Sequence, residues 1–270
     1  MRVLHIWNTA GVASVIAKYQ AKILGWETWV ITRSKYDPYN LTYYGTKVKD
    51  PNYIFYIRVL LIARKYDLIH LHSFDKIIPL MKKIYPDKPI VMHYHGSEIR
   101  NKWESKKRYW SKADVVLIST RDLLNNAPND VIYLPNPVDL EIFKPMSNLT
   151  KNMNAAIYVY DPLNPALSKD ITWAKEIAKR YKLNLKIHNR RKTPINHLNM
   201  PLFLNKFEYF IDRKSIPSLS KTGLEALACG LKVIRWDNNV ITRLPSDHKP
   251  KYVIEKLYDI YESILRNTVF

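Results

Sequence analysis

The sequence predicts an α/β fold of two domains, each a parallel β-sheet that helices cover on both faces. Short apolar strands alternate with helical stretches along most of the 270 residues, which is the pattern of successive βα units. Residues 135–154 interrupt this alternation with prolines and asparagines, a composition typical of a linker. The alternation then starts again, so we expect a second domain of the same kind.

In the first domain, strands are expected at short apolar runs and helices where apolar residues recur on one helical face. The expected strands are residues 2–7, 29–32, 67–72, 89–95, 114–119 and 131–134, and the expected helices are residues 12–24, 53–65, 76–84 and 101–112. Residues 34–52 are polar and rich in tyrosine without a clear period, so we expect a surface excursion there.

In the second domain, the expected strands are residues 156–160, 184–188, 208–211 and 232–236. The expected helices are residues 169–181, a short helix of small residues within 215–237, and an amphipathic helix at 251–266. We expect the last helix to close the second domain. The predicted domains are therefore residues 1–146 and 147–270, two Rossmann-like halves that face each other across a cleft.

A formal net charge of +19 predicts that the protein attracts anionic partners, whatever its fold. Nucleic acid, acidic lipid head groups and phosphorylated small molecules all fit this charge. A lysine-rich, solvated surface of the kind found in thermophiles also accounts for part of it. The charge alone does not choose among these partners.

No apolar run approaches the length of a membrane span, because the longest, residues 53–63, contains Arg58 and stops at Arg64. The first residues predict a strand and not a signal peptide, since no small-residue cleavage site follows them. The single cysteine, Cys229, lies among small residues, where a packed and inert thiol is expected. These features predict a cytoplasmic protein.

A loop rich in serine and lysine leads into the helix of small residues within 215–237. The backbone N–H groups of Lys221, Thr222 and Gly223 are expected to be unpaired at its start, where the helix dipole favours anions. The spacing of Thr222 and Glu225 also fits a capping box, in which both side chains only satisfy backbone groups. An anion-binding site and a capping box are both open interpretations.

Four histidines form two pairs, His70 with His72 and His93 with His95, and each pair points to one face of its strand. Neighbouring strands could combine the pairs into a metal site, but no aspartate, glutamate or cysteine on these strands completes a familiar ligand set. We therefore expect hydrogen-bonded histidines and no metal. His95 differs because Gly96 follows it at the carboxyl end of a strand, where ligands of parallel sheets gather.

Residues 102–112, K-W-E-S-K-K-R-Y-W-S-K, combine cations with Trp103 and Trp110, and residues 190–192 form a second basic cluster. Such a segment could stack on nucleic-acid bases or lie at lipid head groups. Alternatively, the two tryptophans, which are spaced for one helical face, pack inward beneath a solvated surface. The membrane and the inward-packed interpretations are both open, and nucleic acid is the weaker third.

Five segments in order carry a resemblance to a known family. They are Y-D-L-I-H-L-H (66–72), P-I-V-M-H-Y-H-G-S-E (89–98), A-D-V-V-L-I-S-T (113–120), V-I-Y-L-P-N-P-V-D-L-E-I-F-K-P (131–145) and P-S-L-S-K-T-G-L-E-A-L-A-C-G-L-K-V-I (217–234). This series resembles the retaining family-four glycosyltransferases of the GT-B fold, as a short and divergent example.

The resemblance implies a nucleoside-diphosphate sugar donor held by the C-terminal domain, an acceptor held by the N-terminal domain, and no obligatory metal or other cofactor. It places His95 near the transferred sugar, Glu225 on the donor ribose and Lys169 at the donor diphosphate. The remaining expected donor-side residues are Ser218, Lys221, Thr222 and Gly223, and the expected cleft residues on the acceptor side are Asn8, Gly11, His72 and Gly96.

The chain departs from the family pattern at three places. Pro217 stands where the first glutamate of the E-x7-E motif is expected, no arginine precedes Lys169, and the asparagine-glycine pair appears as Asn136-Pro137. The sequence thus predicts a hexosyltransferase-like enzyme of the cytoplasm that works at or near the inner membrane face. Its expected partners are a nucleotide sugar and an anionic membrane surface or lipid-linked acceptor, not nucleic acid. The alternatives are an inactive nucleotide-binding protein of the same fold and a basic nucleic-acid-binding protein.

Overall fold

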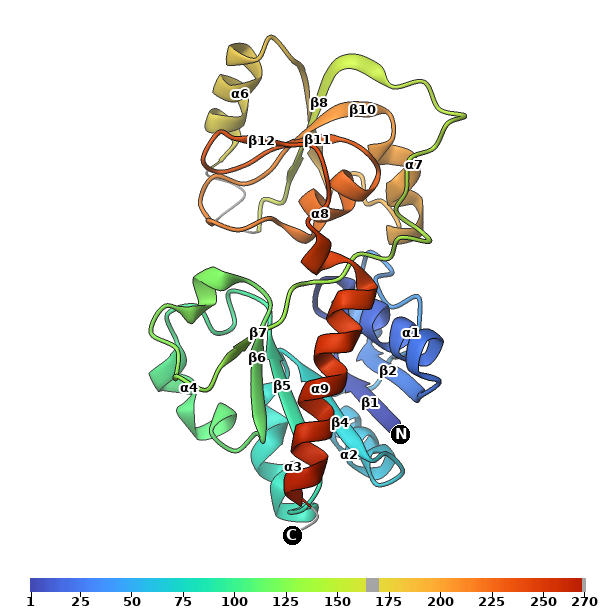
Figure 1. Cartoon of the computed structure of the whole chain (residues 1–270), viewed down its shortest axis with the longest axis vertical. Helices are drawn as coiled ribbons and strands as arrows, with labels where there is room; N and C mark the ends of the chain where they lie inside the picture. The colour runs from blue at the N-terminus through green and yellow to red at the C-terminus, as the bar shows by residue number, and fades with distance from the viewer. Residues whose placement is uncertain (164–169, 269–270) are drawn as a thin grey trace. The chain divides into compact units, whose positions relative to one another are not determined.

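The computed structural model describes residues 1–163 and 170–268, which form two compact units (Figure 1). The N-terminal unit comprises residues 1–137 together with 250–270, and the C-terminal unit comprises residues 138–249. Lys169, which the family resemblance places at the donor diphosphate, lies outside the described residues. The two Rossmann-like halves are present, but their boundaries differ from the predicted division at residues 146 and 147.

The N-terminal unit contains, among its described residues, a sheet of seven parallel strands in the order β3-β2-β1-β4-β5-β6-β7. The strands are β1 (Arg2–Ile6), β2 (Glu27–Arg33), β3 (Thr46–Val48), β4 (Leu68–His72), β5 (Ile90–Tyr94), β6 (Val115–Ile118) and β7 (Ile132–Tyr133). Strand β3 falls within the segment predicted to be an irregular excursion. Its three residues are too few to show an alternating pattern.

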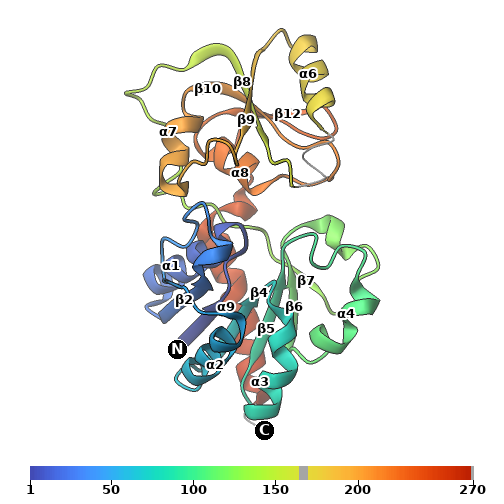
Figure 2. The ribbon, with the colours of Figure 1, turned by 180° about the vertical axis from the view of Figure 1, so that it is seen from behind.

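Helices cover both faces of this sheet (Figure 2). One face carries α1 (Val12–Leu24) and α9 (Pro250–Thr268), and the other carries α2 (Asn52–Ala63), α3 (Ile78–Ile84) and α4 (Trp103–Trp110). Helix α1 ends as predicted at Gly25, whose φ of 66° is left-handed and whose N–H bonds to the carbonyl of Ala21 at 3.1 Å.

Helix α9 belongs to the N-terminal unit, so the prediction that it closes the C-terminal domain is wrong. The reason lies in its apolar stripe, which packs against α1 and against the sheet residues Val3, Leu68 and Val91. Each fully buried side chain of this kind contributes roughly 2 kcal/mol to folding. The stripe consists of Val253, Ile254, Leu257, Tyr261 and Ile264, all of them buried.

The C-terminal unit contains, among its described residues, a five-stranded sheet in the order β12-β11-β10-β8-β9, parallel except for β12. The strands are β8 (Asn152–Tyr160), β9 (Asn184–Asn189), β10 (Phe207–Ile211), β11 (Lys232–Ile234) and β12 (Val240–Ile241). Helix α6 (Ile171–Arg180) packs on one face, and α7 (Met200–Leu204) and α8 (Lys221–Ala228) pack on the other. Helix α7 and strand β12 were not predicted, because both are short and lack a period.

In the described part of the chain, no helix is both long and apolar enough to cross a membrane.

Candidate functional site

In each sheet, the first strands of the unit are added on one side of its first strand and the later strands on the other side, which creates a topological switch point. In the N-terminal unit this point lies between β1 and β4, and in the C-terminal unit it lies between β8 and β10. Loops that leave the carboxyl ends of such strand pairs diverge and open a crevice, where ligands of α/β sheets bind. The candidate sites are therefore the loop ends of β1 and β4 in one unit and of β8 and β10 in the other.

The turn from β1 to α1 holds an unusual backbone. Trp7, Ala10 and Gly11 have φ values of 74°, 53° and 77°, and Gly11 caps the N-terminus of α1. Only glycine adopts such a φ without strain, and strained backbone often gathers at functional sites. Asn8 is buried, and its amide nitrogen donates to the hydroxyls of Ser14 and Thr42, both at 3.0 Å. Asn8 thus holds the loop in shape.

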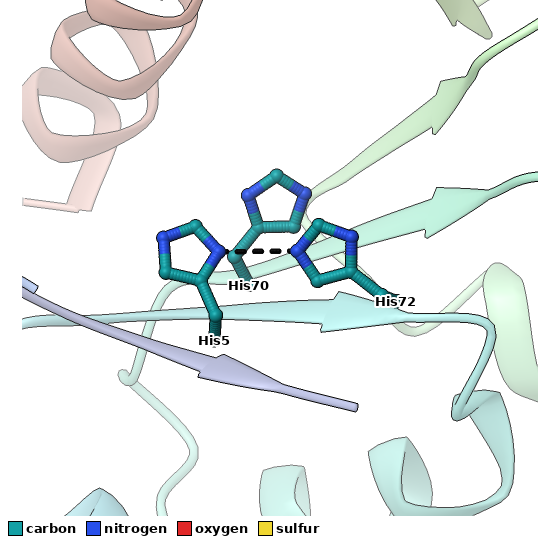
Figure 3. Close-up of side chains that lie close together, drawn as sticks. All are labelled: His5, His70 and His72. Carbon is teal, nitrogen blue, oxygen red and sulfur yellow. Dashed lines mark hydrogen bonds between the residues drawn. The ribbon is translucent and has the colours of Figure 1, made fainter. Parts of the chain in front are cut away.

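Five histidines, His5, His70, His72, His93 and His95, lie together on the face of this sheet that α1 and α9 cover, and we call them the histidine cluster. His5 is in register with His70, and His72 with His93. The first four are fully buried and His95 is partly exposed. Figure 3 shows His5, His70 and His72 turned toward one another from β1 and β4. His5 was not predicted, because its register with His70 becomes visible only once β1 and β4 are known to be neighbours.

A line of hydrogen bonds runs through the cluster from α1 to the end of β5. Gln20 Oε1 lies 2.8 Å from His5 Nε2, and His5 Nδ1 lies 3.1 Å from His72 Nε2. His72 Nδ1 in turn lies 3.1 Å from His95 Nε2. His95 is therefore the outer end of a buried relay that fixes its ring orientation. A separate contact joins His70 Nδ1 to the hydroxyl of Tyr261 at 2.5 Å.

Burial holds the cluster in its neutral form. It lowers the pKa of His5 to about 4, and the pKa values of His70, His72 and His93 lie well below the usual 6.5 for the same reason. The pKa of His95 is also lowered to about 4 by burial, although Glu98 and Asn136 raise it in part. The His95 ring is therefore neutral near pH 7 in this state and acts as a hydrogen-bonding group.

Glu98 organises the loop that follows His95. Its Oε1 accepts the backbone N–H groups of His95 and Gly96, the second at 3.0 Å, and the Ser73 hydroxyl at 2.8 Å. Ser73, at the end of β4, also receives the hydroxyl of Thr9 at 2.9 Å. One carboxylate thereby joins the loops after β1, β4 and β5 into one site.

The geometry of the histidine cluster would also admit a metal ion. Ring nitrogens of His5, His70 and His72 lie within 4.8 Å of one another, and so do those of His72, His93 and His95. Neutral imidazoles are good ligands for zinc and related metals. In the structure, however, His72 uses both ring nitrogens in the relay to His5 and His95.

In the C-terminal unit, the loop after β10 leads into α8 at the other candidate site. The N-cap of α8 is Ser220, whose hydroxyl accepts the N–H of Gly223 at 2.9 Å. The capping box predicted from Thr222 and Glu225 is therefore wrong. Among the described residues, the N–H groups of Lys221 and Thr222 have no partner, as expected at the start of a helix.

Buried carboxylates hold this loop in place. Asp212 accepts the N–H of Ser220 at 2.8 Å, and Asp170, just before α6, accepts the N–H groups of Lys214 and Ser215 at 2.7 and 3.0 Å. Gly223 is required here, because a Cβ at its position would lie 2.7 Å from Asp212 Oδ2. Burial raises the pKa of Asp212. Neither aspartate was predicted as part of the site, although Asp212 directly follows a predicted strand and Asp170 lies at the start of a predicted helix.

Glu225 lies one turn into α8 and points inward. It is 3% exposed, and its carboxylate lies 3.0 Å from the ammonium of Lys221 and 3.9 Å from His197 Nε2. Ser218 accepts a hydrogen bond from Arg213 at 3.1 Å, so a second cation lies in the same loop. Ser218, Lys221, Thr222, Gly223 and Glu225, the expected donor-side residues, lie in this loop and in the first turns of α8. The structure places Gly11, His72, His95 and Gly96 at the other site.

Two other sequence expectations can be compared with the structure. Cys229 is buried, and burial raises the pKa of its thiol to about 12, which fits the expected inert thiol. Trp103 is buried and its indole N–H donates to the carbonyl of Leu123 at 3.1 Å, while that of the partly buried Trp110 donates to the carbonyl of Trp103 at 2.7 Å. The inward-packed interpretation of residues 102–112 is thereby confirmed.

Comparison with known proteins gives a partial family match and several structural likenesses. Residues 12–142 match the model of the family described as Glycosyltransferase Family 4. The glycosyltransferase AviGT4 of avilamycin A biosynthesis shares the fold with a TM-score of 0.57 and 14% identity over 100% of this chain and 92% of its own. The match to the family-four model therefore covers just under half of the chain, while the GT-B fold extends over all of it.

Two further solved structures share the fold of this chain. Sucrose-phosphate synthase from Thermosynechococcus elongatus matches with a TM-score of 0.51 and 13% identity, covering 86% of this chain and 80% of its own. The catalytic domain of starch synthase IV from Arabidopsis thaliana also gives a TM-score of 0.51, with 12% identity, and the match covers 99% of this chain and 94% of that domain. No curated protein sequence matches the chain. The structural likenesses establish the GT-B fold with two Rossmann-like sheets.

Proposed function

We propose that this protein is a glycosyltransferase that takes its sugar from a nucleoside diphosphate bound at the N-terminus of α8. The observation that carries the proposal is the pair of N–H groups at Lys221 and Thr222, which have no partner among the described residues and lie after β10, at the topological switch point of the C-terminal sheet. Such groups and the helix dipole attract a diphosphate. The starch synthase IV structure, which shares the fold, is described as bound to ADP and acarbose.

The chemistry of transfer suits these groups. As the sugar departs, negative charge develops on the diphosphate, and fixed N–H groups and cations stabilise it without a metal. Arg213, Lys214 and Lys221 are described cations in the loop and at the start of α8, and Lys169 is a further candidate from the family resemblance. Glu225 then holds the donor ribose. We propose that the transfer proceeds with retention and needs no metal or other cofactor.

His95 serves the transferred sugar in this proposal. It sits at the carboxyl end of β5, and its neutral ring is oriented by the relay to His72. A neutral imidazole can donate or accept a hydrogen bond at a sugar hydroxyl without the cost of a buried charge. The N-terminal unit then holds the acceptor, near Gly96. The expectation that His72 lines the cleft is not met, because His72 is fully buried and both of its ring nitrogens contact other histidines, so it only orients His95. A lipid-linked acceptor at the inner face of a membrane fits the basic surface of the protein.

A thermal-shift screen with UDP, GDP, ADP and TDP, and with their sugar conjugates, tests the proposal. A ligand present at about a hundredfold excess over its Kd stabilises the native state by about 2.7 kcal/mol. We expect one nucleoside diphosphate to raise the Tm and its sugar conjugate to be turned over. No shift with any of them, together with no release of nucleoside diphosphate, would contradict the proposal.

The main alternative rests on Pro217, which replaces the first glutamate of the E-x7-E motif. An inactive nucleotide-binding protein would give the same thermal shift but release no nucleoside diphosphate from any sugar conjugate. Steeply salt-dependent binding of DNA or RNA that no nucleotide sugar displaces would instead indicate a nucleic-acid-binding protein.

A further inference from the structure

Helix α2 carries an exposed apolar stripe on its outer face. Tyr53, Ile54, Ile57 and Leu61 are 67%, 37%, 55% and 57% exposed. At 100° per residue these four positions fall within about a third of the helix circumference, so they form one continuous surface. Single exposed apolar residues are ordinary, but a stripe along a whole helix marks an interaction surface.

The exposed apolar residues of α2 are not needed to build the core. The opposite face of α2 supplies Phe55, Val59 and Ala63 to the interior of the N-terminal unit, and all three are buried. Arg58 is the single charged residue between Asn52 and Ala63, and it pairs with Asp50 just before the helix. A helix that only needed to cover the sheet would carry polar residues on its outer face.

Cations lie beyond both ends of the stripe. Lys47 and Lys49 precede the helix, Arg64 and Lys65 follow it, and all four are exposed. Arg64 and Lys65 make no ion pair within the described residues. An apolar helix face with a basic border, and a tyrosine at one end, is the composition of a helix that lies in the interface of an anionic bilayer.

We propose that the outer face of α2 docks on an anionic lipid bilayer, with Tyr53, Ile57 and Leu61 inserted among the head groups. Charge complementarity selects this partner, because the protein carries a net charge of +19 and its basic border would repel a second copy. The basic segment 102–112 is a poorer candidate, since Trp103 is buried and Trp110 partly buried.

Sedimentation with vesicles tests the surface. Wild-type protein should pellet with vesicles of one part phosphatidylserine to two parts phosphatidylcholine, and far less with phosphatidylcholine alone. The double variant Ile57→Ser/Leu61→Ser should bind at least about tenfold more weakly, because it removes apolar area from the stripe. Arg64→Glu/Lys65→Glu should weaken binding by about tenfold and reduce its salt dependence.

The matched control is Leu198→Ser/Leu202→Ser, which removes two similarly exposed leucines, 45% and 48%, from the C-terminal unit. It should bind vesicles as the wild type does. All the substituted side chains are exposed, so the Tm of each variant should stay close to that of the wild type. Equal loss of binding in the control and in the α2 variant would overturn the proposal.

A fluorescent label locates the contact directly. Cys229 is buried and unreactive, so an environment-sensitive dye can be attached to Ile57→Cys alone. Its emission should shift to the blue on anionic vesicles, while the same dye at Lys112→Cys on the segment 102–112 should not respond. A response at position 112 without one at position 57 would overturn the proposal. So would a dimer in solution that Ile57→Ser/Leu61→Ser separates while vesicle binding is absent.

This docking does not depend on the proposed glycosyl transfer. The vesicles contain neither a sugar donor nor an acceptor, so a failure to bind them leaves the transfer untouched, and a failure of transfer leaves the binding untouched.

Discussion

The histidine cluster makes the stability of the N-terminal unit sensitive to mild acid. His5 and His95 have folded-state pKa values of about 4, whereas an unfolded histidine titrates near 6.5. Between these values the unfolded chain binds more protons than the folded one, so the free energy of unfolding falls as the pH falls. His70, His72 and His93 act in the same direction.

The size of the effect follows from linkage. When the pH falls from about 7.5 to about 5.5, each histidine that stays neutral in the folded state lowers the free energy of unfolding by about 1.4 kcal/mol. His5 and His95 together therefore remove about 3 kcal/mol, and the three deeper rings increase the loss. This is a large part of the 5–15 kcal/mol that stabilises an ordinary domain.

Urea unfolding at a series of pH values measures this loss, and His93→Leu is the informative variant. Neither ring nitrogen of His93 has a hydrogen-bond partner among the described residues. Leucine at this position removes a titrating group without breaking a hydrogen bond. The loss of unfolding free energy between about pH 7.5 and about pH 5.5 should therefore be smaller by the contribution of one histidine, about 1.4 kcal/mol. His72→Leu should instead lower stability at every pH, since it breaks the contacts to His5 and His95. A free energy of unfolding that stays level from about pH 7.5 to about pH 5.5 would refute the neutral cluster.

Three further predictions concern the chemistry. His95→Ala should lower turnover by about a hundredfold or more and leave nucleoside diphosphate affinity nearly unchanged, as steady-state kinetics and calorimetry can show; a matching loss of affinity would contradict the role. Purified protein should hold no stoichiometric metal and keep its activity in excess chelator, whereas bound zinc with chelator-sensitive activity would make the histidines ligands. Glu225→Ala should weaken the binding of the nucleoside diphosphate by at least about tenfold, because it removes the proposed contact to the ribose. The cap variant Ser220→Ala should mainly lose about 1 kcal/mol of stability, and equal affinities in the two would exclude the ribose role.

The sequence predicts the strands and helices well where periodic runs are long. Helix α1 shows this, since an apolar face and the terminal Gly25 define both its length and its end. The two-residue strand β12 carries too little pattern to be found. Helix α9 is predicted correctly, but its packing partner is not, because an apolar stripe fits any apolar sheet face and does not name one.

The candidate sites are predicted in part, for physical reasons that differ between them. Ser218, Ser220 and Thr222 all offer a capping hydroxyl within five positions. Ser220 is the residue that caps the helix, and its N–H also bonds to the buried Asp212. This bond is a tertiary contact that the local sequence does not display. The neutral state of His95 could not be predicted for a similar reason, because the pKa depends on burial that the sequence does not display.

Hydrogen–deuterium exchange, with and without the nucleoside diphosphate that stabilises the protein most, tests the central claim most directly. Amides that a ligand covers or bonds exchange more slowly, and the method reports their positions. We predict that protection concentrates in residues 212–228, where the loop after β10 enters α8 with the free N–H groups of Lys221 and Thr222. Protection confined to the loops around His95 and Gly11, with residues 212–228 unchanged, would contradict a donor site at α8.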